Sequence, residues 1–308
     1  MNILVTGARG QVGSALLTRL APLGELVAAT RDGTLDRPTP AIALDLSEPS
    51  SLSTVLDAAR PDVIVNAAAY TAVDKAESEE ALAQRVNADA VGALGRWAAQ
   101  AGVPVVHYST DYVFPGVGDR PLRENDPTGP AGAYGRSKLA GEQALATSGA
   151  DHLILRTAWV YDAHGRNFLR TMLRLGSERE RLTVVDDQHG TPTSADLIAA
   201  TTAHVLRRWL NADTTTRRAQ SGVYHLVADG QTTWCGFARA IMERAAKAGL
   251  LDRAPQVEPI TTADFPTPAK RPAWSVLDTA RIRETFDVTL PDWRIGLDQV
   301  IADMVSVR

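Results

Sequence analysis

The chain has 308 residues, of which 44% are hydrophobic and 22% charged, and its formal net charge is −4. These values are typical of a globular protein with a sizeable core, and they disfavour nucleic acid or an anionic membrane as its main partner. The single cysteine, Cys235, cannot form an intrachain disulfide, and we expect a buried, inert thiol. We find no apolar run of roughly 20 residues that could span a membrane and no secretory leader, so we expect a cytoplasmic protein.

Short apolar runs alternate with helical patterns through the first half of the chain, which predicts parallel βαβ units. The predicted strands cover residues 2–6, 25–29, 41–44, 62–66, 103–108 and 152–156. The predicted helices cover residues 11–21, 50–59, 79–100 and 133–147. Each strand is almost entirely apolar, so we expect helices on both faces of the sheet.

The pattern changes after about residue 157, where apolar strands become scarcer and loops longer. We predict a helix over 194–210, a polar loop over 211–220, a strand over 221–227 and a helix over 234–248. The predicted fold is a Rossmann-type, doubly wound α/β sheet formed by residues 1–157 and about 194–227. A smaller α/β substrate-binding lobe is expected from about 158–193 and 228–308.

A GxxGxxG motif follows the first predicted strand directly and precedes the first predicted helix. The motif spans residues 7–13 (GARGQVG), and its expected cofactor contacts are Gly7, Gly10, Gln11, Val12 and Gly13. Glycines let the backbone turn tightly and approach a pyrophosphate, which the free N–H groups of the helix N-terminus stabilise. A plain strand-to-helix turn is the alternative, but the strand before and the helix after favour a dinucleotide site.

The end of the second strand bears on the choice of cofactor. Thr30 and Arg31 occupy the place where an acid usually binds the adenosine ribose, and a guanidinium there can pair with a 2′-phosphate. This favours NADPH over NADH; the alternative is a solvated Arg31, with Asp32 binding the ribose. Further cofactor contacts are expected at later strand ends: Asp45, Leu46, Ala67, Ala68, Ala69, Tyr70, Thr71 and Tyr108.

Tyr134 and Lys138 form a Tyr-x-x-x-Lys pattern inside a predicted helix, where the spacing places both side chains on one face. An ammonium beside a phenol is expected to lower the phenol pKa from about 10, so that the pair can exchange a proton. A surface Tyr and Lys would show the same spacing by chance. The position of the pair downstream of a dinucleotide loop favours a catalytic role.

Two hydroxyl residues, Ser109 and Thr110, end the strand that precedes this helix. The carboxyl ends of parallel strands are where open α/β sheets bind ligands, and a hydroxyl there can donate a hydrogen bond to a substrate carbonyl. Local turn capping is the alternative, and it is the interpretation that we favour for Ser109.

In this order, the glycine motif, the strand-end threonine and the Tyr-x-x-x-Lys pattern resemble the extended short-chain dehydrogenase/reductases. More narrowly, the chain is similar to the dTDP-4-dehydrorhamnose reductase family over nearly its full length. The segments that carry this similarity are 65–77 (VNAAAYTAVDKAE), 107–116 (HYSTDYVFPG), 134–142 (YGRSKLAGE), 155–161 (LRTAWVY), 167–175 (NFLRTMLRL), 187–193 (DQHGTPT), 224–234 (YHLVADGQTTW) and 266–278 (PTPAKRPAWSVLD).

The resemblance implies a catalytic triad of Thr110, Tyr134 and Lys138. Tyr134 would protonate the forming alkoxide, Lys138 would hold the nicotinamide ribose, and Thr110 would orient the carbonyl. The implied reaction is reduction of the C4 keto group of dTDP-4-dehydro-L-rhamnose by NAD(P)H.

The resemblance also implies that Asp111 and Trp159 contact the sugar of a nucleotide-sugar substrate. Arg271 would bind the diphosphate, since a guanidinium can make two parallel hydrogen bonds to phosphate. The alternatives are a core position for Trp159 and a surface salt bridge for Arg271.

Some members of this family are described as pairing through a divalent ion bound by acidic residues on the first helix and the 193–200 segment. Here Ser14 and Ala15 provide no carboxylate at the first place, whereas Asp196 remains at the second. We therefore expect no bound metal, and either a monomer or a homodimer.

Other functions within the superfamily are a nucleotide-sugar epimerase or dehydratase and a non-catalytic, dinucleotide-binding regulatory subunit. Dehydratases of this architecture need two acids after the strand-end threonine, and this chain has only Asp111 there. A purely regulatory subunit is disfavoured because Tyr134 and Lys138 are both present.

Overall fold

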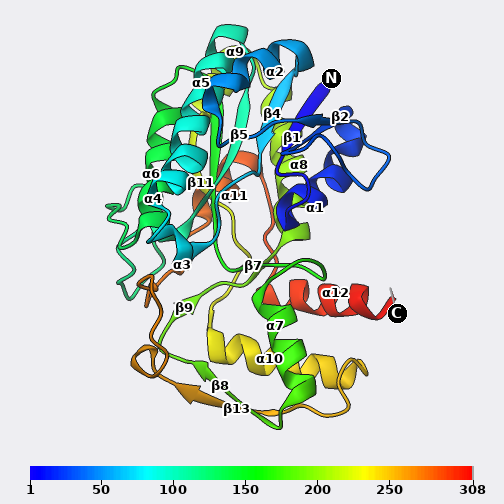
Figure 1. Cartoon of the computed structure of the whole chain (residues 1–308), viewed down its shortest axis with the longest axis vertical. Helices are drawn as coiled ribbons and strands as arrows, with labels where there is room; N and C mark the ends of the chain where they lie inside the picture. Colours follow the sequence, from blue (N-terminus) through cyan, green and yellow to red (C-terminus); the bar gives the residue numbers. More distant parts are fainter. Residues whose placement is uncertain (307–308) are drawn as a thin grey trace.

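A seven-stranded parallel sheet forms the upper part of the molecule in the computed structural model, which describes residues 1–306 (Figure 1). The strand order is β11-β6-β5-β4-β1-β2-β3, and every neighbouring pair is parallel. The strands are β1 (Asn2–Thr6), β2 (Glu25–Thr30), β3 (Ala41–Ala43), β4 (Val63–Asn66), β5 (Val105–Thr110), β6 (His152–Thr157) and β11 (Gly222–His225). The predicted doubly wound α/β sheet is confirmed.

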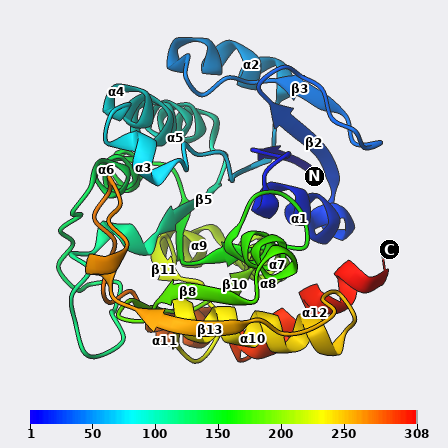
Figure 2. The same ribbon diagram turned by 60° about the horizontal axis from the view of Figure 1, so that its bottom comes forward.

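Helices cover both faces of this sheet, as the apolar strands predict. One face packs against α1 (Gln11–Leu20), α8 (Ala195–Asn211) and α11 (Ala280–Phe286). The other packs against α2 (Leu52–Ala59), α5 (Ala90–Ala101) and α6 (Ala133–Ala146), and Figure 2 shows the two sets on opposite sides. Because side chains alternate along a strand, Ile3 and Val5 enter the first layer and Leu4 the second.

The predicted helix over 79–100 is not uniform. It consists of α4 (Glu80–Gln84), a π-helical turn (Arg85–Asp89) and α5. In the π-helical turn, Asn87 accepts a hydrogen bond from the Tyr70 backbone N–H (2.8 Å) and donates to the Tyr70 carbonyl (3.0 Å) and to Ser137 Oγ (3.0 Å). The turn thus joins the loop after β4 to α6, and π-helical turns of this kind occur frequently at functional sites.

A second core lies below the sheet in Figure 1. It is formed by α7 (Phe168–Glu178), α10 (Trp234–Lys247) and α12 (Trp293–Ser306), together with β8 (Arg181–Val185) and β13 (Gln256–Ile260), which pair in parallel. Four shorter strands connect this lobe to the sheet, namely β7 (Val160–Tyr161) with β10 (Thr193–Ser194), and β9 (His189–Gly190) with β12 (Thr232–Thr233). Cys235 is buried in this core, as expected.

Two elements differ from the sequence prediction. The polar segment 211–220 contains a short helix, α9 (Thr214–Ala219), because Asp213 caps it by accepting from the Thr216 N–H (3.0 Å). The helix α11 belongs to the sequence range expected in the smaller lobe, yet its Ile282 and Phe286 pack in the core of the sheet domain.

A further short helix is α3 (Val73–Ala76). Among residues 1–306, no helix combines the length and apolar character needed to cross a membrane.

Candidate active site

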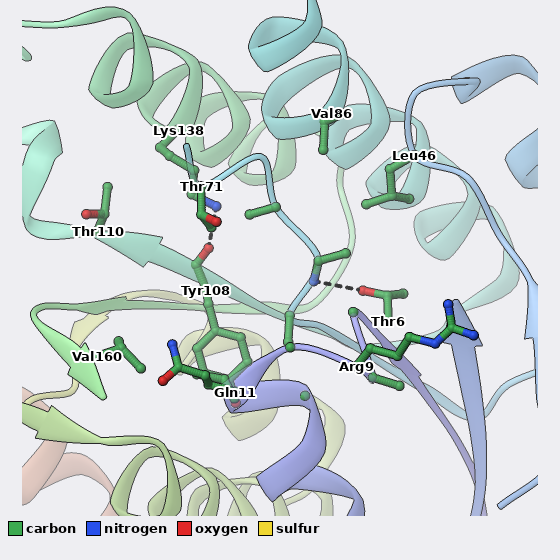
Figure 3. Close-up of a pocket in the computed structure, with 18 of the residues that line it drawn as sticks. Thr6, Arg9, Gln11, Leu46, Thr71, Val86, Tyr108, Thr110, Lys138 and Val160 are labelled. Carbon is green, nitrogen blue, oxygen red and sulfur yellow. Dashed lines mark hydrogen bonds between the residues drawn. The ribbon is translucent and has the colours of Figure 1, made fainter. Parts of the chain in front are cut away.

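A cavity of about 970 Å³ opens at the carboxyl ends of the parallel strands (Figure 3). Nearly all of the predicted site residues line it. They are Gly7, Gly10, Gln11, Val12, Gly13, Thr30, Arg31, Asp45, Leu46, Ala67, Ala68, Ala69, Thr71, Tyr108, Thr110, Asp111, Tyr134, Lys138 and Trp159. Residues distant in sequence, from the first glycine loop to the loop after β6, therefore face one space.

The glycine loop leaves no room for side chains. Gly7 has φ +66°, and a Cβ atom there would lie 2.6 Å from the Ala68 backbone nitrogen. A Cβ atom on Gly13 would lie 2.1 Å from the Gly7 carbonyl oxygen. Because α1 begins at Gln11 with no side chain capping it, its first N–H groups are left for an anion.

The adenosine end of the predicted cofactor site carries two arginines. The Arg31 side chain is 84% exposed and lies 4.0 Å from the Asp45 carboxylate. Asp32, the alternative ribose ligand, pairs instead with Arg9 of the glycine loop (3.0 Å) and accepts from the Thr34 N–H (3.1 Å). The Arg9 guanidinium holds the pKa of Asp32 below its usual value, so this carboxylate stays charged and already has partners.

Tyr134 and Lys138 lie on the first two turns of α6, and both side chains line the cavity. Lys138 is only 2% exposed, and its Nζ donates to the Tyr108 carbonyl oxygen (2.7 Å; Figure 3). Burial lowers the pKa of Lys138 to about 8. Burial raises the pKa of Tyr134, which is the opposite of the expected direction, because removal of the phenol from water outweighs other influences. The phenol therefore remains protonated at neutral pH.

The hydroxyl residue that caps the turn after β5 also differs from the one expected. Thr110, not Ser109, is the residue that caps, since its Oγ1 accepts from the Tyr112 N–H (3.2 Å) and donates to Asp111 Oδ1 (2.9 Å). Ser109 Oγ and Asp111 Oδ2 are buried with no hydrogen-bond partner within residues 1–306, and both residues line the cavity. Burial raises the pKa of Asp111 to about 6. These two atoms therefore have unused hydrogen-bonding capacity next to the cavity.

Trp159 combines the two roles considered for it. It lines the cavity, and its indole also stacks on Trp234 of the lower lobe, with ring centroids 3.6 Å apart and an interplanar angle of 7°. A Cβ atom on Gly190 would lie 2.4 Å from this indole, so the ring is held between Gly190 and Trp234. The Trp159 backbone has φ +47°, which is uncommon for a bulky residue and marks a constrained position.

Two predicted site residues do not line the cavity. The Tyr70 hydroxyl donates to Glu79 Oε2 (2.5 Å), which turns the ring away from it. Arg271 forms the salt bridge considered as its alternative, with Asp74 Oδ2 (2.6 Å), and also approaches the Tyr112 hydroxyl (3.4 Å).

Asp196, the acidic residue considered as a metal ligand, is bound by an arginine side chain. The Arg19 guanidinium makes two hydrogen bonds to the Asp196 carboxylate, at 2.7 and 2.6 Å. Over residues 1–306, no group of three or more His, Cys, Asp or Glu side chains has the arrangement of a metal site.

Several cavity residues were missed by the sequence analysis. Thr157 ends β6 as Thr110 ends β5, so the same strand-end rule could have identified it. Arg9 lies inside the glycine motif, but its neighbour Asp32 is 23 residues away in sequence, and only the fold brings them together. Arg166 follows the short strand β7, whose isolated sequence gives no signal.

Comparison with known proteins places these features in a family context. The family model described as the RmlD substrate binding domain matches residues 1–306. The chain is 47% identical over 306 residues to a dTDP-4-dehydrorhamnose reductase of Salmonella typhimurium, with 99% of each chain covered. It is also 47% identical over 308 residues to the reductase of that name from Burkholderia thailandensis, covering 99% of this chain and all of that one.

Solved structures agree with this similarity. A dTDP-4-dehydrorhamnose reductase from Clostridium acetobutylicum superposes with a TM-score of 0.86 at 34% identity, covering 99% of both chains. One from Bacillus anthracis, in complex with NADP, superposes with a TM-score of 0.84 at 32% identity, covering 98% of this chain and 99% of that one.

Proposed function

The chain belongs to the RmlD substrate binding domain family, and on this basis we propose that it is an NAD(P)H-dependent dTDP-4-dehydrorhamnose reductase. The reaction converts the C4 keto group of dTDP-4-dehydro-L-rhamnose into a hydroxyl group. One observation carries the proposal: the glycine loop, Thr110, Tyr134 and Lys138 all face one cavity, in a chain similar end to end to reductases of this name.

The residues present fit a nicotinamide dinucleotide. The close packing at Gly7 and Gly13 leaves the backbone N–H groups at the start of α1 open for a pyrophosphate. Asp45 and Leu46 would bind the adenosine portion, Ala67, Ala68 and Ala69 would let the cofactor lie against the backbone, and Lys138 would hold the nicotinamide ribose. When bound, NAD(P)H supplies the hydride, which no side chain can provide.

The protein's own residues orient the substrate and provide the proton. Tyr134 donates its phenolic proton to the substrate oxygen as the carbonyl is reduced, which its raised pKa permits because the phenol stays protonated. Thr110 turns its hydroxyl from Asp111 toward the carbonyl. Asp111 then accepts hydrogen bonds from sugar hydroxyls through Oδ2, which has no partner within residues 1–306. The Trp159 indole, whose ring is held between Gly190 and Trp234, contacts the sugar through the edge that lines the cavity.

Arg271 is the residue that we propose for binding the diphosphate of the substrate. Arg271 lies outside the cavity, but it approaches the hydroxyl of Tyr112, which lines the cavity. We propose that Arg271 reaches the diphosphate past Tyr112 while Asp74 keeps its guanidinium in place. Tyr70 would act only through its backbone, which Asn87 fixes.

NADPH is the preferred cofactor in this proposal. Arg9 and Arg31 stand at the adenosine end, and Asp32, which would repel a 2′-phosphate, is neutralised by Arg9. In this proposal Asp32 pairs with Arg9 and is not the ribose ligand that would favour NADH.

The sugar end of the cavity disfavours a dehydratase. Among the described lining residues, Asp111 is the one carboxylate there, since Asp32 and Asp45 lie at the adenosine end. A reductase of another keto sugar remains the second candidate. A specific observation favours it: the chain is 39% identical to a probable dTDP-4,6-dihydroxy-2-methyloxan-3-one 4-ketoreductase from Streptomyces antibioticus.

We also propose that the protein acts in the cytoplasm as a monomer or homodimer, with a nucleotide-sugar substrate and without nucleic acid, membrane or metal. The bidentate pairing of Arg19 with Asp196 supports the last point, because a neutralised carboxylate is a poor ligand for a divalent ion.

The experiment is to mix the purified protein with NADPH or NADH and each of several dTDP-4-keto-6-deoxysugars, and to follow oxidation of the cofactor. We expect stoichiometric oxidation with dTDP-4-dehydro-L-rhamnose and formation of dTDP-L-rhamnose. Faster turnover of another keto sugar would favour the second candidate. Conversion of a sugar without net oxidation of the cofactor would contradict a reductase.

A further inference from the structure

A buried histidine, His107, lies directly behind the proposed active site. It occupies the middle of β5, is 0% exposed and does not line the cavity. Its Nε2 atom is 3.4 Å from Lys138 Nζ. A buried imidazole beside a buried amine is costly unless the hydrogen bonds of both groups are matched, so the arrangement of protons around His107 has consequences for Lys138.

A chain of hydrogen bonds determines which nitrogen of His107 carries the proton. The Thr6 hydroxyl donates to Asn66 Oδ1 (2.5 Å), so Asn66 presents its amide nitrogen to His107 Nδ1 (3.0 Å). Nδ1 must then accept a hydrogen bond. Burial and the nearby Lys138 hold the pKa of His107 well below its usual value, so the ring is neutral and its one proton is on Nε2.

This proton points at the Lys138 amine. An ammonium has no lone pair with which to accept it, whereas an uncharged amine does. The other contact of Nζ, its hydrogen bond to the Tyr108 carbonyl oxygen, can be made by either form. The N–H group of His107 therefore disfavours the charged form of Lys138, in the same direction as burial.

Other titratable groups around the amine are few. Tyr134 and Glu142 lie on the same helix, and Asp111 lines the same cavity from the segment after β5. Glu142 is bound by Arg156 on β6 through two hydrogen bonds, at 2.9 and 2.7 Å. Glu142 still raises the pKa of Lys138, against the effect of burial, although Arg156 offsets part of its charge.

We propose that His107 is a positioning residue for the reductase reaction: its Nε2–H group, fixed by Asn66 and Thr6, faces the Lys138 amine and sets how readily that amine loses a proton. The inference rests on the proposed function, because it assigns His107 a role through the lysine of that site. It adds a residue that touches neither cofactor nor substrate.

The tautomer can be tested on the wild-type protein without any assay of activity. The chain has six histidines, so long-range ¹H–¹⁵N spectra of the imidazoles are simple to assign by substitution. We expect the His107 resonances to show a neutral ring protonated at Nε2 that does not titrate while the protein stays folded. A ring protonated at Nδ1, or a charged ring at neutral pH, would overturn the proposal.

The effect on Lys138 is tested by NMR titration of ¹³C-labelled lysine, which is favourable because the chain has four lysines and the other three are exposed. We expect Lys138 to titrate near 8. His107→Asn, whose amide cannot reach Nζ, should raise this midpoint by roughly one unit. His107→Gln, whose amide nitrogen can replace Nε2, should keep it. The control His152→Asn removes a buried imidazole far from the amine, on β6, and should leave the Lys138 midpoint unchanged.

In the active enzyme, the alkaline limb of kcat/KM should move upward in His107→Asn together with the Lys138 midpoint. A lower rate with an unmoved Lys138 midpoint would mean a merely structural role and would overturn the proposal. Absence of turnover in the wild type would refute the proposed function, and the two titrations would still decide the inference about His107.

Discussion

In the proposed reaction, proton donation depends on one phenol, that of Tyr134. Tyr134 is partly buried on the first turn of α6, and the removal of its phenol from water keeps it protonated, whereas Lys138 is buried one turn later with a lowered pKa. In the proposed reaction the two groups divide their tasks: the tyrosine supplies the proton, and the lysine holds the ribose and adjusts the local charge. Both roles require the side chains to stay on the cavity side of α6.

Substitution Tyr134→Phe should lower kcat at least about a hundredfold, because the general acid is lost while the shape of the site is kept. Cofactor affinity, measured by quenching of tryptophan fluorescence, should change little. Tyr224→Phe is the matched control, since its hydroxyl donates to the Gln220 carbonyl away from the cavity. Near-normal turnover of the Tyr134 variant would exclude this phenol as the acid.

Substitution Asp111→Asn should raise the thermal stability of the protein and weaken its use of the substrate. The folded-state pKa of Asp111 is raised to about 6, so its stabilising contribution is present at pH values below the ordinary pKa near 4 and is lost as the pH rises through about 6. At pH 7.5 the uncharged amide avoids the cost of a buried charge, and Tm should rise by a few degrees.

The same variant should lower kcat/KM about tenfold or more and should flatten the acid limb near pH 6, because the amide that replaces the carboxyl group does not titrate. Thermal melts and pH profiles of both proteins provide the measurement. A variant with a lower Tm at pH 7.5 and an unchanged acid limb would show that the Asp111 carboxylate is neither strained by burial nor used for binding.

Substitution Arg31→Ala should raise KM for NADPH by roughly tenfold and leave KM for NADH nearly unchanged, since a charged hydrogen bond to the 2′-phosphate is lost. Arg207→Ala, an exposed arginine on α8 outside the cavity, serves as the control. Equal changes for the two cofactors would remove Arg31 from the 2′-phosphate site and leave Arg9 as the candidate.

At the scale of elements, α6 must keep a fixed position on the sheet. Its Glu142 forms a bidentate ion pair with Arg156 of β6, and both side chains are 4% exposed. Arg156 also lies over the Phe114 ring, 4.9 Å from its centroid. The pair joins α6 to β6, and neither of its side chains lines the cavity.

Substitution Glu142→Ala should cost about 3–5 kcal/mol of unfolding free energy, because it leaves the Arg156 charge buried and unpaired. The control is Glu178→Ala, which removes an exposed pair with Arg174 on α7 and should cost less than ~0.5 kcal/mol. Urea denaturation measures both. Small and equal losses of unfolding free energy in the two variants would mean that Arg156 binds water or another side chain once Glu142 is removed.

The elements that the sequence predicts well are those whose signal is local. The strands β1, β4 and β5 each contain an apolar run, and the glycine motif follows β1 directly, so periodicity and spacing were enough to place them. The π-helical turn at Asn87 was not predictable, because it depends on hydrogen bonds to Tyr70 and Ser137, which lie 17 and 50 residues away. Likewise, no local signal shows that burial raises the pKa of Tyr134.

For the molecule as a whole, the site combines two cores that alternate along the chain. The sheet provides the glycine loop and the strand ends, while Trp159 extends from the sheet and is fixed by Trp234 of the lower lobe. The resemblance of separate motifs predicted this combination, but not the contacts that occupy Arg271 and Asp32. Such contacts arise only when distant segments pack together.

Transfer of deuterium from the cofactor shows whether hydride is delivered to the keto carbon of the sugar in this site. The protein is incubated with NADPH deuterated at the transferable position on nicotinamide C4 and with dTDP-4-dehydro-L-rhamnose, and the product sugar is analysed by NMR. If the nicotinamide delivers its hydride to the keto carbon, one deuterium is expected at C4 of the dTDP-L-rhamnose formed for each cofactor oxidised. A product without deuterium, or with deuterium at another carbon, would contradict the reductase mechanism.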